Sequence, residues 1–462
     1  MTDTLMVGVS GVRGIVGKDL TDEVVGRYAR AFGLWAKGRT PVVVVGRDAR
    51  ESGPAFERAV VDGLGAVGCA VVTVGLVPTP TVQLAVEHHA AGGGIAITAS
   101  HNPIEWNALK FIGPDGIFLD GADGARVAAL AAESAGSGKR ETGKVTADPG
   151  AVERHLEAVL KLPAVDVPGI RARNFTVALD AVRGAGGPVM RALLERLGCE
   201  VAGINLETDG RFPRSPEPVP ENLGGLSTLV TRAGAALGIA VDPDVDRLAI
   251  VDETGTPIGE DYTLAFAVRA VLGGKRGMGN GKRVVVCNLS TSLVVEDAAR
   301  ECGAEVVRTP VGEVHVARAI VQLAAAIGGE GNGGVMYPAL HAGRDAPVAA
   351  ALLLTLLARS GKRVSELVAA APRYTIVKAR AERGTRKAER GLEDVYAALR
   401  KRFPEASVDT QDGLRLAWRD RWLHVRPSNT EPIIRLIAEA PSGAERGAQQ
   451  FVDEARRVCA GS

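Results

Sequence analysis

The sequence predicts an α/β protein with three related strand–helix–strand domains followed by a small α+β domain. Three observations predict this architecture. The order strand, polar turn, amphipathic helix, strand occurs three times along the 462 residues. The first strand of each repeat is a continuous apolar run, which is typical of parallel strands buried on both faces. After Pro372 the pattern changes to several strands and two helices.

The first repeat begins with the apolar strand Val42–Val45 and continues through the polar turn Gly46–Asp48 into a helix. Apolar residues in this helix recur three and four positions apart, so they share one face. They are Phe56, Ala59, Val60, Gly63, Leu64 and Val67. The stretch Gly63–Gly68 fits GxGxxG, but it ends a helix and precedes a strand, which is the reverse of the dinucleotide-binding order. We therefore dismiss a dinucleotide site.

The second and third repeats follow the same plan. Thr176–Leu179 leads to Asp180 and a helix, and Val284–Val286 leads to Asn288 and a helix. In each repeat the second strand opens with glycine and a small residue. These pairs are Gly68-Cys69, Gly198-Cys199 and Gly303-Ala304. The shared ending favours a true internal repeat over three unrelated α/β segments.

The last segment predicts the α+β domain. We expect strands at Tyr374–Val377 and Ile433–Ala438 and a hairpin of Leu414–Trp418 with Trp422–Val425. Helices are expected at Leu392–Phe403 and from about Ala444 to Cys459. Short linkers then divide the chain into domains at 1–150, 151–255, 256–371 and 372–462.

Composition excludes several function classes. Lys plus Arg is 55 and Asp plus Glu is 54, which argues against nucleic acid or an anionic membrane as a partner. The five cysteines form no CxxC pair, so neither a disulfide framework nor a zinc cluster is expected. The longest apolar run, Ala346–Ala358, is too short to cross a bilayer and predicts a buried helix. We expect a cytoplasmic protein whose partner is a small molecule. The sequence leaves open whether the chain forms a homo-oligomer.

The first chemical motif is Thr98-Ala99-Ser100-His101-Asn102-Pro103, where an apolar strand enters a turn. Ser100 stands at the tip, as a nucleophilic serine must. His101 is adjacent in sequence, a spacing that rarely lets the ring reach the hydroxyl, and no GxSxG elbow is present. An ordinary polar turn remains the alternative interpretation of this motif alone.

The second motif places Asp242, Asp244 and Asp246 at alternate positions between two apolar runs. In an extended segment the three carboxylates would point the same way and repel one another unless a cation lay between them. Oxygen ligands favour Mg²⁺ or Ca²⁺. Arg247 takes the place of the glycine that an EF-hand loop needs, so we expect a Mg²⁺ site with open positions for a serine phosphate.

Two further motifs indicate ligand contacts. Residues 426–432, Arg-Pro-Ser-Asn-Thr-Glu-Pro, offer a planar guanidinium and short donors suited to phosphate. Residues 328–334 hold five glycines, which let the backbone approach a ligand closely, while Glu330 and Asn332 can grip sugar hydroxyls. A plain polar turn and a bare flexible loop are the respective alternatives.

Together, and in this order, the four motifs resemble the α-D-phosphohexomutase family over essentially the whole chain. Ser10-Gly11-Val12-Arg13-Gly14 is similar to the family's N-terminal active-site segment. The resemblance implies four domains around a central cleft. It also implies an isomerase that moves phosphate between O1 and O6 of a hexose through a phosphoserine and a 1,6-bisphosphate, the latter also an activator.

The resemblance assigns a role to each motif. Ser100, as phosphoserine, and Asp242, Asp244 and Asp246 would hold one Mg²⁺. The catalytic residues would be Ser100, Arg13, His101, Lys110 and Arg247, with Lys110 in general acid/base work. Glu330 and Asn332 would contact the sugar. The phosphate that does not react would be held by Arg426, Ser428, Asn429 and Thr430.

Departures from the family pattern bear on the substrate. Asn332 and Gly334 stand where many members have serine and histidine, and Glu313 lies where some glucose and mannose enzymes place a histidine. This sugar loop, followed by His341–Asp345, resembles the branch assigned as phosphoglucosamine mutase, although His341 and Arg344 could be structural.

Glucosamine phosphate is therefore the favoured substrate. The nearest rival is a glucose or mannose phosphate mutase. A non-catalytic sugar-phosphate-binding protein is disfavoured by the intact Ser100 and the three aspartates, and a phosphatase is a further alternative.

Overall fold

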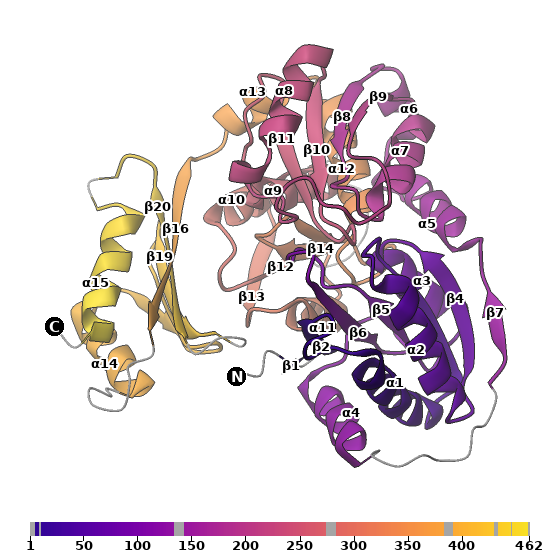
Figure 1. Ribbon diagram of the computed structural model, residues 1–462. Coiled ribbons are helices and arrows are strands. Elements are labelled where there is room, and N and C mark those ends of the chain that lie inside the picture. The colour runs from indigo at the N-terminus through magenta and orange to yellow at the C-terminus, as the bar shows by residue number, and fades with distance from the viewer. Residues whose placement is uncertain are drawn as a thin grey trace.

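The computed structural model describes residues 5–8, 11–133, 143–273, 283–382, 391–428, 433–444 and 446–460. It confirms the α/β class with a C-terminal α+β domain, and the described strands form four sheets (Figure 1). We number the domains I to IV after these sheets, while the expected boundaries between them stay a prediction. Within the described residues, none of the helices is both long and apolar enough to cross a membrane.

Domain I has a seven-stranded sheet in the order β1-β2-β6-β5-β3-β4-β7. Its strands are β1 (Met6–Gly8), β2 (Gly11–Ile15), β3 (Val42–Arg47), β4 (Ala70–Leu76), β5 (Gly93–Ile97), β6 (Trp106–Ile112) and β7 (Val145–Ala147). Its helices are α1 (Asp22–Lys37), α2 (Gly53–Gly65), α3 (Thr79–His88) and α4 (Gly121–Glu133). Strand β3 is parallel to β4 and β5, and its inner residues are fully buried, as its valine run predicts.

Domains II and III each have a four-stranded sheet, ordered β11-β10-β8-β9 and β13-β12-β14-β15. The strands are β8 (Thr176–Asp180), β9 (Glu200–Ile204), β10 (Leu237–Val241), β11 (Leu248–Asp252), β12 (Val284–Asn288), β13 (Glu305–Thr309), β14 (Ile327–Glu330) and β15 (Gly334–Met336). The helices of domain II are α5 (Ala151–Leu160), α6 (Val167–Arg171), α7 (Gly186–Arg196), the 3₁₀ turn η1 (Pro220–Asn222) and α8 (Gly224–Ala233). Those of domain III are α9 (Asp261–Leu272), α10 (Leu293–Glu301), α11 (Glu313–Leu323), α12 (Ala346–Ser360) and α13 (Val364–Ala369).

One hydrophobic core runs through both of these domains. The long apolar helix α12 lies in that core and is buried almost throughout, as expected for the run Ala346–Ala358. Domain I and domain IV have cores of their own.

Domain IV has the sheet order β16-β20-β19-β18-β17, all antiparallel, and stands apart from the other sheets in Figure 1. Its elements are β16 (Tyr374–Glu382), α14 (Leu392–Arg402), β17 (Ser407–Asp409), β18 (Leu414–Ala417), β19 (Trp422–Pro427), β20 (Ile433–Pro441) and α15 (Ala448–Ala460). Glu439 joins domain IV to domain III by accepting hydrogen bonds from the Ser292 hydroxyl and, at 2.9 Å, from the Leu293 amide.

The three repeats are longer than the sequence analysis recognised. After the expected strand–helix–strand, each continues with a further helix and an antiparallel strand pair, namely β5–β6, β10–β11 and β14–β15. The loops that close these pairs hold Ser100, the three aspartates, and the residues after Glu330. Three of the four chemical motifs therefore occupy equivalent places in three copies of one supersecondary unit.

Candidate active site

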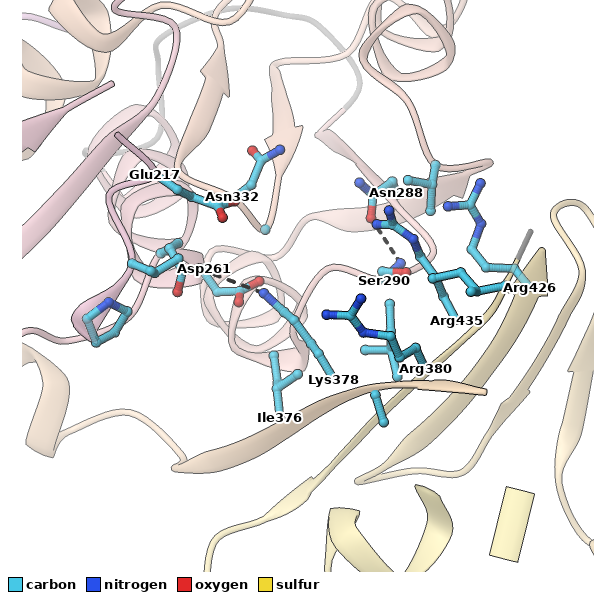
Figure 2. Close-up of a pocket in the computed structure, with 18 of the residues that line it drawn as sticks. Glu217, Asp261, Asn288, Ser290, Asn332, Ile376, Lys378, Arg380, Arg426 and Arg435 are labelled. Atoms are coloured by element: carbon cyan, nitrogen blue, oxygen red, sulfur yellow. Dashed lines mark hydrogen bonds and ion pairs between the residues drawn. The ribbon is translucent and has the colours of Figure 1, made fainter. Parts of the chain in front are cut away.

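A cavity of about 1060 Å³ separates the sheet of domain IV from domains II and III (Figure 2). Arg380, Arg435 and Arg426 lie along one wall. Arg435 is directly opposite Arg380 on β16 and directly opposite Arg426 on β19, so the three form one cross-strand row. Guanidinium groups offer planar sets of donors that match phosphate oxygens, so this wall suits a phosphate.

The sequence analysis expected Arg426, Ser428, Asn429 and Thr430 to hold phosphate. Arg426 is 5% exposed and pairs with Asp412 at 2.8 Å. The amide of Ser428 donates to the Ile433 carbonyl at 2.9 Å, which closes the turn. Asn429 and Thr430 lie outside the described residues, so their part in the wall stays a prediction.

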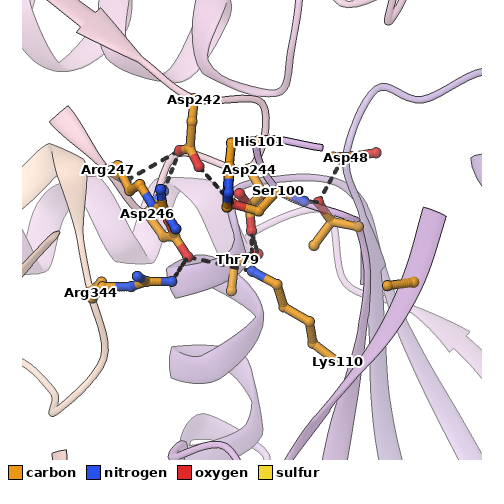
Figure 3. A network of polar contacts seen from close by, with 12 residues as sticks. Asp48, Thr79, Ser100, His101, Lys110, Asp242, Asp244, Asp246, Arg247 and Arg344 are labelled. Atoms are coloured by element: carbon orange, nitrogen blue, oxygen red, sulfur yellow. Dashed lines mark hydrogen bonds and ion pairs between the residues drawn. The ribbon is translucent and has the colours of Figure 1, made fainter. Parts of the chain in front are cut away.

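The serine turn lies beside the aspartate cluster (Figure 3). Ser100 is 3% exposed and has a φ of 49°, a left-handed conformation that costs energy for a residue with a side chain. Its Oγ donates to Asp242 Oδ2 at 2.8 Å. His101 Nδ1 lies 3.4 Å from the same Oγ, so the ring does reach the serine, although the sequence analysis considered this rare for adjacent residues.

Arg50 holds the strained turn in place and was missed from the sequence. Its guanidinium is 1% exposed and donates to the carbonyls of Ser100 and Asn102 at 2.7 Å and to those of Pro103 and Trp106 at 2.8 Å. Its Nε also pairs with Asp48 at 3.2 Å. A basic residue in the polar turn after β3 was the available signal, because parallel strands present such turns at one sheet edge.

The three aspartates converge, but not because the segment is extended. Residues 242–247 form a turn, with Val245 at a φ of 62°. All three carboxylates are at most 1% exposed and have ligand atoms within 4.8 Å of one another. The expectation of an extended segment was therefore wrong, while the expectation of convergence was correct.

Protein donors engage only part of this cluster. Asp242 Oδ1 accepts from the amides of Asp246 and Arg247 at 3.1 and 3.2 Å, and Asp244 Oδ2 accepts from Thr79 Oγ1 at 2.7 Å. Within the part of the chain that the structure describes, Oδ1 of Asp244 and Oδ1 of Asp246 are buried with no hydrogen-bond partner. Buried carboxylate oxygens are costly to leave unpaired, so these atoms fit a cation.

Two basic residues, Lys110 and Arg344, hold the other oxygen of Asp246. Lys110 Nζ donates to Asp244 Oδ2 at 2.6 Å and to Asp246 Oδ2 at 3.4 Å. Arg344 donates to Asp246 Oδ2 at 2.7 Å. Both bases therefore occupy Oδ2, while Oδ1 accepts no hydrogen bond from the described residues.

The charges around the cluster are unbalanced. Among the described residues, the acidic side chains here are Asp242, Asp244, Asp246, Glu313 and Glu330, and the basic ones are Arg13, Lys110, Arg247 and Arg344. With every group charged, the acids exceed the bases by one, and a phosphate on Ser100 would add negative charge that a divalent cation would offset. Burial, followed by repulsion from Asp246 and Asp244, raises the pKa of Asp242 well above its ordinary value.

The remaining expected catalytic residues surround Ser100. Arg13 donates to Asn102 Oδ1 at 2.6 Å, and Arg247 lies 3.3 Å from Glu217 Oε1. The neighbouring charge of Arg247, with burial, holds the pKa of His101 well below its usual range, so this histidine is neutral. Burial alone would lower the pKa of Lys110, but Asp244 and Asp246 outweigh it and the pKa is raised.

The sugar loop reaches both the cluster and the cavity. Glu330 is 4% exposed and accepts from Asn288 Nδ2 and from Arg344, each at 2.9 Å. Asn332 lines the cavity and lies 3.4 Å from Glu330 Oε2. The structure thus brings Ser100, the aspartates and Lys110 into one network and places Arg426 and Asn332 on the lining of the cavity.

Comparison with known proteins gives one consistent family. Four domain profiles of phosphoglucomutase/phosphomannomutase match the chain: α/β/α domains I, II and III at residues 4–136, 153–255 and 259–374, and the C-terminal domain at 377–457.

Similar sequences and structures cover nearly the whole chain. A "Phosphoglucomutase/phosphomannomutase" of Thermococcus kodakarensis is 39% identical, and a "Probable phosphoglucosamine mutase" of Methanopyrus kandleri is 40% identical. Each of these alignments covers 97% of both chains. The crystal structure of a phosphoglucomutase/phosphomannomutase family protein from Burkholderia thailandensis superposes with a TM-score of 0.85 at 27% identity, over 99% of this chain and 97% of that one.

Proposed function

The chain belongs to the phosphoglucomutase/phosphomannomutase family of α-D-phosphohexomutases, and we propose that it interconverts glucosamine 6-phosphate and glucosamine 1-phosphate. The phosphoryl carrier is Ser100. The observation that supports this most strongly is the 2.8 Å contact between Ser100 Oγ and Asp242, within a carboxylate cluster whose free oxygens suit a cation.

One Mg²⁺ fits the cluster. Oxygen-only ligands and the excess of negative charge favour this hard divalent cation, which Asp242, Asp244, Asp246 and the phosphate on Ser100 would hold. When bound, the ion offsets the charge on the transferring phosphoryl group. Arg13 and Arg247 add positive charge beside the same group.

The reaction consists of two phosphoryl transfers. In the first, the bond between Ser100 Oγ and phosphorus breaks and a sugar hydroxyl bonds to phosphorus, which gives the 1,6-bisphosphate. The bisphosphate then presents its other end, and the reverse transfer restores the phosphoserine. Added hexose 1,6-bisphosphate would therefore activate protein that has lost its phosphate.

The hydrogen bonds suggest the proton transfers for the form with a free Ser100. Ser100 Oγ donates to Asp242 Oδ2 at 2.8 Å and the pKa of Asp242 is raised, so this carboxylate accepts the serine proton as the hydroxyl attacks the bisphosphate, with His101 3.4 Å from the same oxygen. Protonated Lys110 donates to the departing sugar oxygen. The first transfer runs with both roles reversed, so protons balance over the full cycle.

The arginine wall can hold the bisphosphate in either of its two orientations. Arg426, Arg435 and Arg380 offer donors for the phosphate that is not reacting, whichever end of the sugar carries it. A wall that reads phosphate rather than the ring accepts both orientations of the bisphosphate.

The charge pattern of the cavity favours an amino sugar. Carboxylates of Glu217, Glu221 and Glu260 line it on the side of domains II and III; Glu217 already pairs with Arg247 at 3.3 Å and Glu260 with Lys378 at 3.8 Å, so Glu221 is the carboxylate we assign to an ammonium group. Glucosamine phosphate carries an ammonium group and a phosphate, so it complements both walls, whereas glucose and mannose phosphates complement one. The 39% identical relative named phosphoglucomutase/phosphomannomutase keeps those two sugars as the second candidate.

A coupled assay with the 1- and 6-phosphates of glucosamine, glucose and mannose tests the proposal. We expect the highest kcat/KM for the glucosamine phosphates. A higher value for glucose or mannose would establish the second candidate, and no mutase activity with any of the three would refute the proposal.

A second test separates the sugar loop from the phosphate wall. Asn332→Ser should raise activity on glucose phosphate relative to glucosamine phosphate, whereas Arg426→Ala should lower both by a similar factor. If Arg426→Ala shifts the ratio while Asn332→Ser leaves it unchanged, this division of roles is wrong.

A further inference from the structure

Arg344 occupies the junction between the sugar loop and the aspartate cluster, and neither motif includes it. It lies between β15 and α12, and its side chain is 8% exposed. One terminal nitrogen donates to Glu330 at 2.9 Å. The other donates to Asp246 at 2.7 Å and pairs with Glu313 at 3.0 Å. A single guanidinium thus connects three acidic side chains from three separate elements.

The contact with Arg344 fixes the direction of the Glu330 carboxylate. Its Oε1 accepts from Asn288, and its Oε2 accepts from Arg344 at 2.9 Å and from Asn332 at the longer distance of 3.4 Å, so both oxygens are held and Arg344 makes the shorter contact to Oε2. A carboxylate held at both oxygens has little freedom to rotate, and its remaining lone pairs keep a set direction.

The chain leaves space for this arginine at Gly334. A Cβ atom at position 334 would lie 2.2 Å from Arg344 Cδ and 2.9 Å from its Cγ. Any side chain at this position would therefore displace Arg344. Gly334 is the last residue of the sugar loop, so the loop backbone and Arg344 fit together as one unit.

We propose that Arg344 is a positioning residue for sugar recognition: it aims Glu330 at the hexose and holds it in a fixed relation to the cluster residue Asp246. The inference rests on the proposed function, because it takes Glu330 as a sugar contact. Arg344 itself acts through Glu330 and does not touch the sugar. A purely structural Arg344, which only neutralises the surrounding acids, is the alternative.

Ligand binding separates the two roles without turnover. In a Ser100→Ala background with Mg²⁺, calorimetry would measure binding of glucosamine 6-phosphate and of glycerol 3-phosphate, which has the phosphate but not the ring. We expect the affinity for glucosamine 6-phosphate to fall by about tenfold or more in each of three variants, because a charge-assisted contact is lost or misdirected. The variants are Arg344→Met, Gly334→Ala and Glu330→Gln. Glycerol 3-phosphate should change by less than about twofold, because neither Arg344 nor Glu330 reads phosphate.

The double variant Arg344→Met/Glu330→Gln gives the sharpest result. If Arg344 acts through Glu330, the double variant binds glucosamine 6-phosphate no more weakly than Glu330→Gln alone. Arg344→Lys, which keeps the charge but not the planar fork, should be intermediate. Gly224→Ala is the matched control for Gly334→Ala, because a Cβ there meets open space.

Several outcomes would overturn the inference. One is an equal loss of affinity for glucosamine 6-phosphate and glycerol 3-phosphate. Another is a double variant whose loss of affinity equals the product of the two single losses. The third is a Gly334→Ala protein that binds as tightly as the Gly224→Ala control. If Arg344→Met fails to fold, Arg344→Lys and Gly334→Ala still decide the question. If the Ser100→Ala parent binds glycerol 3-phosphate but not the sugar phosphate, the proposed substrate fails, and that result is seen before any Arg344 variant is measured.

Discussion

Two neighbouring residues contact two different buried carboxylate centres. Arg344 contacts the aspartate cluster through Asp246, whereas Asp345 is itself the carboxylate of the second centre, and the two centres differ in how fully their oxygens are hydrogen-bonded. Asp345 Oδ2 has His155 and His341 at 2.8 and 3.0 Å, and Asp345 Oδ1 accepts from the Val348 amide at 2.9 Å. In the aspartate cluster, by contrast, two buried oxygens have no hydrogen-bond partner among the described residues.

The difference indicates which centre serves the fold and which serves function. Thr81 of domain I contacts His155 at 2.8 Å, so Asp345 links helices of domains I, II and III through satisfied hydrogen bonds. A satisfied buried carboxylate stabilises its partners' arrangement. The cluster keeps unsatisfied oxygens and a strained serine, a cost that a protein retains where a ligand will bind.

The largest expected effect is on chemistry at the unsatisfied centre. Ser100→Ala removes the phosphoryl carrier and should lower kcat/KM by at least about a thousandfold, which is roughly 4 kcal/mol of transition-state stabilisation. The melting temperature should change little. Steady-state assays together with circular dichroism would check both, and an active alanine variant would disprove the assignment of Ser100.

The next largest effect is on stability at the satisfied centre. Asp345→Asn removes the charged acceptor of two buried imidazoles and should cost about 3 kcal/mol of unfolding free energy. Urea unfolding would measure this value. A loss of Mg²⁺ binding with unchanged stability would show that Asp345 belongs to the active site instead.

At the cluster, the same chemical change should act in the opposite way. Asp242→Asn should weaken Mg²⁺ binding while leaving the metal-free protein equally or more stable, because burial and repulsion from Asp246 and Asp244 already disfavour charge on this carboxylate. Calorimetric Mg²⁺ titration and apo melting curves would test this. A large fall in apo melting temperature with normal Mg²⁺ affinity would make the cluster structural.

The smallest effect concerns pH. Burial opposes charge on Asp345, but His155 and His341 outweigh it and hold its pKa below the ordinary value. Its contribution to stability is therefore complete above the ordinary carboxyl pKa of about 4 and is lost as pH falls toward the folded value. Urea unfolding between pH 6 and 3 should show that the free energy of unfolding falls less steeply with decreasing pH in Asp345→Asn than in wild type. The same pH dependence in both proteins would contradict this.

The pKa of Asp242 is shifted the other way, since burial and its neighbouring carboxylates raise it. In metal-free protein this destabilises the folded state as pH rises through the folded pKa. Asp242→Asn should therefore gain apo stability toward neutral pH, whereas Asp345→Asn should not.

Local patterns were enough to predict much of this architecture. Apolar runs and helical spacing gave the three repeats, and the motifs around Ser100, Asp242 and Glu330 were found because each interrupts such a run. The hairpin half of each repeat was missed because its strands pair around the very loops that looked like irregular turns.

Other features depend on contacts that sequence does not display. Arg50 looks like any basic residue in a surface turn, yet it binds four carbonyls of the serine turn. The role of Arg344 depends on its distance to Asp246, 98 positions away. The convergence of the aspartates was predicted for a wrong reason, because a positive φ at Val245 shapes the turn.

The central claim is that the unsatisfied carboxylate cluster serves phosphoryl transfer at Ser100. The most direct measurement is intact-mass and peptide mass spectrometry of protein loaded with glucose 1,6-bisphosphate and then mixed with excess glucosamine 6-phosphate, with either Mg²⁺ or EDTA. The account predicts one phosphate on Ser100 that leaves with the sugar only when Mg²⁺ is present. A phosphate on another residue, no phosphate at all, or equal transfer in EDTA would contradict it.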